Sequence, residues 1–521
     1  MQIALVQCAA RCGDFAGNLA HLEECLAAAS NDVLYLLPPN ALAGFATASL
    51  AKSQSFATAQ EQALAYLARH LPHKRLLVPL TPCGQRQNLG CAFLREGSWQ
   101  ELALGSSSQQ GHLMFGRLEL EGLTLGLLVG GSALPLEDPL ADLDGQVFAG
   151  KSCDLLCVSQ AFAWSPGLVE RLFARYAALA KDLACPIFAV SAVGGEDGSL
   201  FSGQSLVLDQ KGKLCCRGLA FEEDLLVSDA QKVLRLSPDP EPLEAIWLAL
   251  LRGTKDFVRH CGLSKVFVGL SGGLDSALVL CVAAHALGPE QVYAVLMPSP
   301  YTSEASKEDA LALARNLGVE HLTLPISPLM QTLQKYLEPA LTNFPPQKGD
   351  VTWENLQARI RGLLLSTLAN RAQALILNTS NKSEAATGYS TLYGDTVGAL
   401  AVIGDLTKSQ VYAVARWYRQ HFPREQEIPL RILEKAPSAE LAPNQKDSDS
   451  LPPYEVLDPI LCALLCGTAP RTATERSLGK RLLSAEFKRR QEPLALMLSS
   501  VPFGSAFRLP VAARFCPPVL A

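Results

Sequence analysis

The chain has 521 residues, of which 49% are apolar and 18% charged, and its formal net charge is −5. A disordered chain would be rich in charge and poor in apolar residues, so this composition excludes one. The acidic balance also gives no overall positive field for nucleic acid phosphates. Since this length suits two hydrophobic cores better than one, we expect a two-domain globular protein with no nucleic acid partner.

The sequence shows neither an export signal nor a membrane segment. Apolar stretches such as 266–270 and 278–284 fall far short of the roughly 20 residues of a spanning helix, and the opening MQIALVQCAA has no positively charged segment. We therefore expect a cytoplasmic protein with no membrane contact. The 15 cysteines include Cys8, Cys281 and Cys462 within apolar runs, and none has CxxC spacing. We expect reduced, buried thiols and no cysteine-based metal site.

Up to about residue 235, short β-like runs alternate with amphipathic stretches. The runs predict strands at 3–6, 33–37, 75–79, 123–129, 155–158, 187–190 and 204–208, and the stretches predict helices at 18–30 and 167–183. This alternation indicates an α/β domain, residues 1–235, whose sheet is largely buried. The proline-rich segment 236–244 is predicted to be a linker.

The same alternation restarts after the linker, in a second domain predicted at 245–521. A strand is expected at 266–270, a helix from about Asp275, a strand at 292–297 and a helix at 306–317. Between the first of these strands and its helix stands Ser271-Gly272-Gly273-Leu274-Asp275-Ser276. Glycines let backbone approach a ligand closely, and free N–H groups at a helix start bind phosphate. A plain Gly-Gly turn would explain the glycines but not the whole motif.

This motif resembles the PP-loop of ATP-using ligases and thiolases, which cleave ATP between the α and β phosphates, and differs from the GxxxxGK[ST] loop of kinases. The loop alone leaves xanthylate, aspartate, citrulline, tRNA bases and deamido-NAD open as substrates. Later segments narrow the choice, namely 297–303 (MPSPYTS), 354–362 (ENLQARIRG), 378–384 (NTSNKSE), 388–395 (GYSTLYGD), 437–441 (PSAEL), 447–458 and 487–491. Together they closely resemble NAD+ synthetase, especially the long form with a fused glutaminase domain.

The resemblance implies a role for each matching residue. ATP would be bound by Gly269, Leu270, Ser271, Gly272, Gly273, Leu274, Asp275, Ser276, Thr379 and Lys408. Mg2+ would be held by Asp275 and Glu384. Deamido-NAD would be contacted by Asn355, Glu384, Tyr389, Ser390, Thr391, Leu392 and Lys488. Asp395 is a further catalytic candidate, which would hold or deprotonate the nitrogen nucleophile.

The chemistry agrees with these residue types. A carboxylate is a poor electrophile, so ATP first adenylates the nicotinate oxygen and releases pyrophosphate. Lysines and Mg2+ would stabilise the charge that builds on the phosphate oxygens. Ammonia then displaces AMP and forms the amide.

The N-terminal half resembles the nitrilase-type (CN hydrolase) amidase of the long synthetases, through 1–18, 38–45, 193–197 and 220–227. In that family glutamine is hydrolysed by a Glu–Lys–Cys triad. Pro39 stands where the glutamate is expected and Gly130 where the cysteine is expected. The lysine loop is represented by a shortened 105–111 segment, GSSSQQG, without lysine. Because a proline cannot relay protons and a glycine cannot attack a carbonyl, we expect a degenerate glutaminase.

The sequence thus predicts a nitrilase-like α/β sandwich followed by an adenine-nucleotide α-hydrolase-like (PP-loop) parallel sheet with flanking helices. The expected protein is an NAD+ synthetase that uses ATP, Mg2+, deamido-NAD and free ammonia, and forms at least a dimer through its synthetase domain. The alternatives are a glutaminase rescued by Cys153 or Cys157 or supplied by a partner, another PP-loop ligase or thiolase, and a regulatory pseudoenzyme that binds NAD precursors. Two departures from the family pattern bear on substrate affinity and so on the last alternative, namely Ser380, where the family usually has glycine, and the stretch 494–501 near Lys488. The expected ATP and metal residues are intact.

Overall fold

The computed structural model describes residues 1–27, 30–39, 41–45, 48–84, 86, 88–106, 113–140, 153–443, 445–504 and 507–511. The chain divides into two compact units, Met1–Ala249 and Leu250–Ala521. The segment 236–244, predicted as a linker, includes the last residue of β16 (Arg235–Leu236) and the first residues of α5 (Pro242–His260). The domain limits predicted from the sequence stay predictions.

The described part of the first unit contains two large sheets and a short ribbon. The first sheet has the order β15-β1-β2-β3-β4-β5 and the second the order β16-β14-β13-β10-β9-β8-β7-β6. Strands of the first sheet are β1 (Gln2–Gln7), β2 (Val33–Leu36), β3 (Arg75–Leu80), β4 (Gly90–Arg95), β5 (Ser98–Glu101) and β15 (Asp224–Ser228). Strands of the second, besides β16, are β6 (Leu104–Ser106), β7 (Leu113–Leu120), β8 (Leu123–Ser132), β9 (Leu155–Phe162), β10 (Ile187–Ser191), β13 (Leu206–Leu208) and β14 (Leu214–Arg217). The ribbon pairs β11 (Val193–Glu196) with β12 (Ser199–Ser202).

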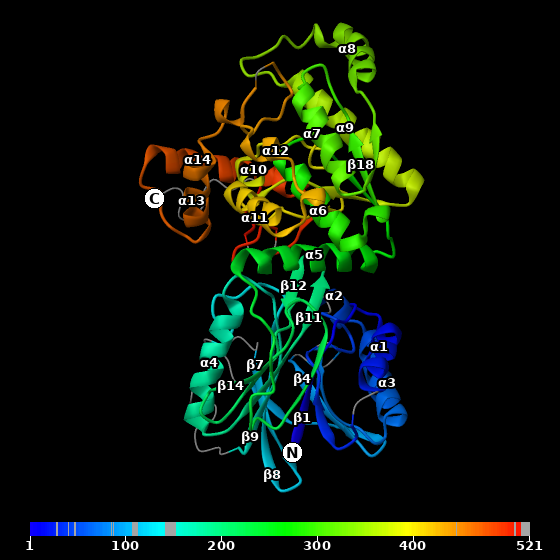
Figure 1. The fold of residues 1–521 in the computed structure, drawn as a ribbon, viewed down its shortest axis with the longest axis vertical. Helices are drawn as coiled ribbons and strands as arrows, with labels where there is room; N and C mark the ends of the chain where they lie inside the picture. Colours follow the sequence, from blue (N-terminus) through cyan, green and yellow to red (C-terminus); the bar gives the residue numbers. More distant parts are fainter. Residues whose placement is uncertain are drawn as a thin grey trace. The chain divides into compact units, whose positions relative to one another are not determined.

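Helices cover the outer faces of these sheets, and Figure 1 shows α1 and α3 on one side of the strands and α4 on the other. They are α1 (Phe15–Ala27), α3 (Gln54–His70) and α4 (Leu168–Leu183), with the short α2 (Ala48–Ala51) before α3. In β1, Ile3 and Leu5 belong to the core between the sheets, whereas Ala4 and Val6 pack with α1 and α3. Because both faces of the strand are buried, its sequence is a continuous apolar run.

Parallel pairing brings the carboxyl ends of several strands of this unit to common edges. β1, β2 and β3 are mutually parallel in the first sheet, and β8, β9 and β10 in the second. One predicted strand is shorter than expected. The run 204–208 is a strand only from Leu206, because Gln204 has a φ of +53°, outside the β region.

The second unit is built on one parallel sheet with the order β19-β18-β17-β20-β21-β22. Its strands are β17 (Val266–Gly269), β18 (Val292–Leu296), β19 (Glu320–Thr323), β20 (Leu375–Asn378), β21 (Leu400–Ala401) and β22 (Leu494–Ala495). Its helices, beyond α5, are α6 (Leu274–Leu287), α7 (Glu304–Asn316), α8 (Ser327–Leu341), α9 (Thr352–Ala372), α10 (Lys382–Thr387), α11 (Lys408–His421), α12 (Leu430–Glu434), α13 (Tyr454–Leu465), α14 (Ala473–Ser484) and α15 (Glu486–Arg489).

The strand order reverses direction between β17 and β20. From β17 the chain proceeds outward to β18 and β19, and then returns to β20 on the other side of β17. Ligands of open α/β sheets bind beyond the carboxyl ends of the strands at such a switch point. The Ser-Gly-Gly loop follows β17 and the NTSNKSE segment follows β20, so the topology brings both predicted motifs to this place.

The cysteines are mostly as expected, with one correction. Cys8 and Cys281 are buried, whereas Cys462 is exposed. On α13 the buried residues include Tyr454, Leu457, Leu461 and Leu465. Cys462 lies off this stripe although its neighbours in the sequence are apolar. The prediction of a buried thiol at this position was therefore wrong.

Candidate active site

The loop after β17 has the geometry of a phosphate-binding turn. Gly272 has a φ of +81°, and a Cβ there would lie 2.2 Å from the backbone oxygen of Ser306, so only glycine fits. Ser276 Oγ accepts a hydrogen bond from the Ser271 N–H (3.2 Å) and donates one to the Gly273 oxygen (3.0 Å). These bonds fix the loop at the amino end of α6, where unpaired N–H groups and the helix dipole favour an anion.

Two carboxylates and one lysine meet beside this loop. Lys408 Nζ lies 2.5 Å from Asp275 Oδ2 and 3.7 Å from Glu384 Oε1. The lysine side chain is only 5% exposed, while Asp275 and Glu384 keep 17% and 19%. The three residues come from the starts of α6, α10 and α11, which follow β17, β20 and β21. The sheet topology therefore brings Asp275 to two groups that lie more than 100 residues further along the sequence.

Helix caps orient these side chains. Asn381 caps α10 and accepts from the Glu384 N–H, while Glu384 accepts from the Asn381 N–H in return, which forms a capping box. Asn381 Nδ2 also donates to Asp275 Oδ1 at 3.0 Å. Thr407 forms a second capping box at the start of α11, immediately before Lys408. The capping boxes thus fix the ends of α10 and α11 from which Glu384 and Lys408 project.

Burial and mutual repulsion dominate the electrostatics of this cluster. Desolvation, followed by the charge of Asp275, raises the pKa of Glu384 to about 8. For Lys408, burial disfavours the charged form, but Asp275 and Glu384 outweigh it and raise the pKa above its usual value. A divalent cation would relieve the repulsion between the two carboxylates. The donors therefore fit Mg2+, which prefers one or two carboxylates together with substrate phosphate oxygens.

Within the described ranges, no group of three or more His, Cys, Asp or Glu side chains is placed to hold a metal. Two carboxylates alone would leave most of an octahedral shell open. Phosphate oxygens and water would have to complete it, which agrees with a site that binds the metal together with a nucleotide.

A second polar cluster lies on the segment after α10. Thr391 Oγ1 donates to Asn355 Oδ1 at 2.6 Å, and the Thr391 N–H donates to Asp395 Oδ1 at 2.7 Å. Lys488 Nζ donates to the carbonyl oxygens of Gly388 (2.7 Å) and Ser390 (2.5 Å). The structure therefore brings together Asn355, Ser390, Thr391, Asp395 and Lys488, which the sequence analysis assigned to deamido-NAD or to the nucleophile.

Part of Asp395 is exposed to solvent, but protein atoms pack around its carboxyl group. Desolvation raises the pKa of Asp395 to about 6, although its hydrogen bond from Thr391 and the charges of Lys488 and Arg361 act in the opposite direction. A carboxyl group of this kind titrates close to neutral pH and can exchange a proton with a ligand.

Several residues of the site were missed by the sequence analysis. Asp447 Oδ2 accepts from the Tyr454 hydroxyl (2.9 Å), and its Oδ1 lies 3.3 Å from the Tyr389 hydroxyl. The Lys408 Nζ lies 5.6 Å from the centre of the Tyr454 ring. Asp447 and Tyr454 thus connect the two clusters. Asn381 also belongs to the site, and Asn-x-x-Glu is a capping-box pattern that could have indicated it. Asp447 and Tyr454 lie in the segment 447–458 of the resemblance, which assigned them no role.

For three further residues of the sequence analysis, the structure gives only their burial or a local hydrogen bond. Leu392 and Thr379 are half-buried, Thr379 directly after β20, and their proposed ligand contacts stay predictions. Ser380, where the family usually has glycine, donates its N–H to Asn378 Oδ1 at 2.8 Å and fits without a positive φ.

The corresponding edge of the first unit is chemically different. Pro39 is buried after β2, and Gly130 is buried within β8, paired with Gln160 of β9. A cavity of about 20 Å³ lies next to Pro39 and is lined also by Cys8, Phe45, Glu196 and Phe201. The Glu196 carboxylate accepts a hydrogen bond from the Phe45 N–H. A cavity of this volume holds roughly one water molecule.

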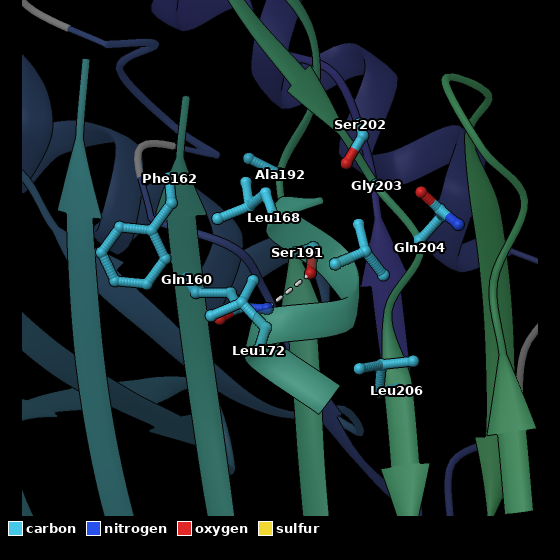
Figure 2. Close-up of a pocket in the computed structure, with 11 residues that line it drawn as sticks. Gln160, Phe162, Leu168, Leu172, Ser191, Ala192, Ser202, Gly203, Gln204 and Leu206 are labelled. Carbon is cyan, nitrogen blue, oxygen red and sulfur yellow. Dashed lines mark hydrogen bonds between the residues drawn. The ribbon is translucent and has the colours of Figure 1, made fainter. Parts of the chain in front are cut away.

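A second cavity of about 10 Å³ lies beside Gln160 and Ser191 (Figure 2). Gln160 Nε2 donates to Ser191 Oγ at 2.8 Å, and Gln160 Oε1 accepts from the Tyr176 hydroxyl. The Ser191 N–H in turn donates to Ser205 Oγ, which is bonded to Gln7 Oε1. These amides and hydroxyls satisfy one another. Such a satisfied network rigidifies a core.

Cys153 and Cys157, named above as possible replacements for the expected nucleophile, do not lie at its expected position. Cys153 precedes β9, and Cys157 pairs with Leu127, three residues before Gly130 on β8. At about 3.3 Å per strand residue, Cys157 is roughly 10 Å from the expected position. Its thiol is buried in the core between the sheets, and burial raises its pKa above the usual range. Of the 105–111 loop, only Gly105 and Ser106 belong to the described residues.

Comparisons with known proteins agree with this geometry. The NAD synthase family model matches residues 246–491. A glutamine-dependent NAD(+) synthetase of Rhodobacter capsulatus is 36% identical over 390 residues, which cover 70% of each chain. The chain belongs to the NAD+ synthetase family. A relative from Synechocystis sp. is 43% identical over 355 residues. That match covers 65% of this chain and 62% of the Synechocystis protein, less than two thirds of its length.

A structure of the glutamine-dependent NAD+ synthetase of Acinetobacter baumannii, in complex with ADP, aligns over 98% of both chains, with a TM-score of 0.74 and 29% identity. A synthetase from Cytophaga hutchinsonii has a TM-score of 0.78 but 17% identity, which shows a common fold alone. The predicted fold class, a nitrilase-like sandwich and a parallel PP-loop sheet, is confirmed. Among the described residues, no helix is long and apolar enough to cross a membrane.

Proposed function

We propose that this chain is an NAD+ synthetase that adenylates deamido-NAD with ATP and then amidates it with ammonia. The observation that carries the proposal is the Asp275–Lys408–Glu384 cluster at the amino end of α6, beside a loop in which Gly272 admits no side chain. Such a cluster is suited to a nucleotide whose phosphates carry most of the charge.

Each step of this reaction would depend on particular residues of the chain. The backbone N–H groups of the Ser-Gly-Gly loop would bind ATP phosphates, and Lys408 would stabilise the charge that builds on the α-phosphate. Asp275 and Glu384 would hold Mg2+, which when bound supplies positive charge to the pyrophosphate oxygens. Thr391 and Lys488 would position the pyridine carboxylate of deamido-NAD for attack on the α-phosphorus.

The nitrogen source is the finer part of the proposal. We propose free ammonia, because Pro39 and Gly130 occupy the expected triad positions and the cavity beside Pro39 holds roughly one water molecule. The matched relatives are named as glutamine-dependent enzymes, so this chain would differ from them in its first unit. A glutaminase supplied by a partner protein is the alternative source.

A direct assay tests both parts. Purified chain is incubated with deamido-NAD, ATP and Mg2+, with either an ammonium salt or glutamine, and NAD+ and pyrophosphate are measured. We expect NAD+ with ammonium only. NAD+ formed equally well from glutamine would overturn the free-ammonia reading. If neither nitrogen source gives NAD+ or pyrophosphate, the proposal of a synthetase is refuted, and a pseudoenzyme that binds NAD precursors is favoured.

We also propose a homo-oligomer, at least a dimer through the second unit. Large apolar side chains are exposed in and around α8 and α9, including Tyr336 at 79%, Phe344 at 73% and Leu363 at 62%. Exposed apolar patches commonly mark protein contacts. Light scattering in solution should give at least twice the mass of one chain. A cytoplasmic location stays a prediction of the sequence.

A further inference from the structure

A carboxyl group that the proposed mechanism does not use lies next to the deamido-NAD cluster. Glu492 follows α15, four residues after Lys488. Its Oε1 is buried and, among the described residues, has no hydrogen-bond partner. Buried polar atoms are nearly always paired, because leaving water without a new partner is unfavourable. The unpaired oxygen therefore calls for an explanation.

The charged groups around Glu492 do not neutralise it. Those that face it are Arg489, Asp395, Lys488 and Glu486. Arg489 is paired with Glu486, at 2.9 Å between Nη2 and Oε2. Lys488 donates to the carbonyl oxygens of Gly388 and Ser390. Both cations are thus engaged with other acceptors, and the remaining neighbour, Asp395, is itself a carboxyl group.

A second unpaired atom belongs to Ser390, a residue that Lys488 contacts. The Ser390 hydroxyl oxygen is also buried and finds no hydrogen-bond partner in the part of the chain that the structure describes, while the carbonyl oxygen of the same residue accepts from Lys488. A carboxylate oxygen and a hydroxyl oxygen, both unpaired, therefore belong to residues that interact with the same lysine of the deamido-NAD cluster. A small ligand with several N–H groups, such as ammonium, is the class of group that satisfies such acceptors.

We propose that Glu492 is the proton acceptor for the nitrogen nucleophile and acts beside Asp395. The inference rests on the proposed function, in which ammonia comes from solution. In neutral water ammonia is mostly ammonium, which has no free electron pair. One N–H bond breaks, the proton passes to the Glu492 carboxylate, and the nitrogen keeps the electron pair. That pair forms the C–N bond at the adenylated carboxyl carbon, the C–O bond breaks and its electron pair leaves with AMP, and the second proton passes from the nitrogen to the Asp395 carboxylate.

The acidity of the group agrees with this role. Desolvation raises the pKa of Glu492 to about 7, against the charges of Arg489 and Lys488, and Asp395 adds to the rise. A proton acceptor works best when its pKa lies near the working pH. A carboxylate with an ordinary pKa would be a weaker base toward ammonium.

The test is the variant Glu492→Gln in the full chain. It keeps the shape and the hydrogen-bonding capacity but cannot take a proton. We expect kcat/KM for ammonium to fall about 100-fold near neutral pH, a typical contribution of a general base. The loss should shrink toward about pH 9, where more free ammonia is present. Pyrophosphate–ATP exchange with deamido-NAD, which reports adenylation alone, should stay within about twofold of wild type.

Glu455→Gln, an exposed glutamate on α13, is the control and should change neither measurement. If Glu492→Gln fails to fold, Glu492→Asp keeps the charge and should give a smaller loss with the same pH dependence. Unchanged ammonium kinetics from about pH 6 to about 9, or an equal loss in exchange, would overturn the inference. A wild-type chain that makes no NAD+ from ammonium would instead refute the proposed function.

Discussion

The two units place very different residues at the carboxyl ends of their parallel strands. In the second unit this edge carries a lysine between two carboxylates and a loop with an obligatory glycine. In the first unit the comparable edge carries Pro39 and a glycine within a strand, next to amides and hydroxyls that satisfy one another. A parallel sheet therefore offers a place for chemistry, and whether chemistry occurs there depends on unsatisfied charge and free N–H groups.

The two units also differ in how closely side chains pack around these edges. The two cavities described in the first unit have volumes of about 10 and 20 Å³, so each accommodates roughly one water molecule. In the second unit, groups with raised pKa values such as Glu384 and Asp395 keep part of their surface exposed. Stored electrostatic strain of this kind is typical of functional sites, whereas the closed network of the first unit is typical of a structural core.

The largest expected loss of activity comes from removing Lys408, at the carboxyl ends of the strands of the second unit. Lys408→Ala removes the cation between Asp275 and Glu384, which leaves two carboxylates facing each other and no lysine for the phosphates. We expect ammonium-dependent NAD+ formation to fall about 1,000-fold, as for the loss of a principal charge-stabilising group. Steady-state kinetics measure it. Lys307→Ala, which removes an exposed lysine paired with Glu304, is the control. A loss below about tenfold would contradict the assigned role.

A smaller loss is expected from Gly272→Ala. The new Cβ would meet the Ser306 oxygen at 2.2 Å in a backbone with φ +81°, so the loop has to move away from its phosphate-binding shape. We expect the KM for ATP to rise about tenfold or more and the free energy of unfolding to drop by about 1–3 kcal/mol.

Gly262→Ala separates strain from steric conflict in that experiment. Gly262 has a similar φ of +73°, but apart from its own chain neighbours no atom of the described ranges lies within 4 Å of its Cβ position. It should cost about 1 kcal/mol of stability and leave the KM for ATP unchanged. If both variants raise KM alike, the close approach to Ser306 is not what shapes the loop.

A modest pH effect is expected in the first unit, at His21. Contacts with the Cys25 thiol and with Glu223 raise the pKa of His21 to about 10. Since the folded pKa lies above the ordinary 6.5, this stabilisation is complete below pH 6.5 and is lost as the pH rises through about 10. Glu223→Gln should therefore weaken α1 near neutral pH by at most about 1 kcal/mol, because both side chains are about a third exposed.

Hydrogen exchange of α1 amides, compared between wild type and Glu223→Gln at equal pH, measures this effect locally. The difference in protection should be clear at pH 7 and vanish by about pH 10. A difference that does not depend on pH would mean that Glu223 acts through packing and not through the charge of His21.

No glutamine-dependent activity is expected to appear in the double variant Pro39→Glu and Gly130→Cys. The two substitutions restore the types of two triad members, but the expected lysine is still absent and the cavity beside Pro39 still holds about one water. NAD+ formation from glutamine should stay below about 1% of that from ammonium. Retained ammonium-dependent activity shows that the variant is folded. Restored glutamine use would contradict the expectation that the first unit offers no glutaminase site.

Local sequence was sufficient for the features that depend on neighbours along the chain. The apolar runs of β17 and β18, the Ser-Gly-Gly loop and the start of α6 were all predicted, because period, glycines and helix starts are short-range signals. The same reasoning failed at Gln204, where a positive φ shortens β13, and at Cys462, where an apolar neighbourhood in sequence faces solvent.

Only the tertiary structure decided which groups act together. Lys408 reaches Asp275 across 133 positions, and Tyr389 meets Asp447 across 58. Glu492 had no local signal, because its unpaired oxygen results from what packs around it. The sequence by itself determined the kind of chemistry, through residue types and turns. The fold determined its strength, because burial and distance set the charge interactions, and both depend on segments that meet only after the sheet has formed.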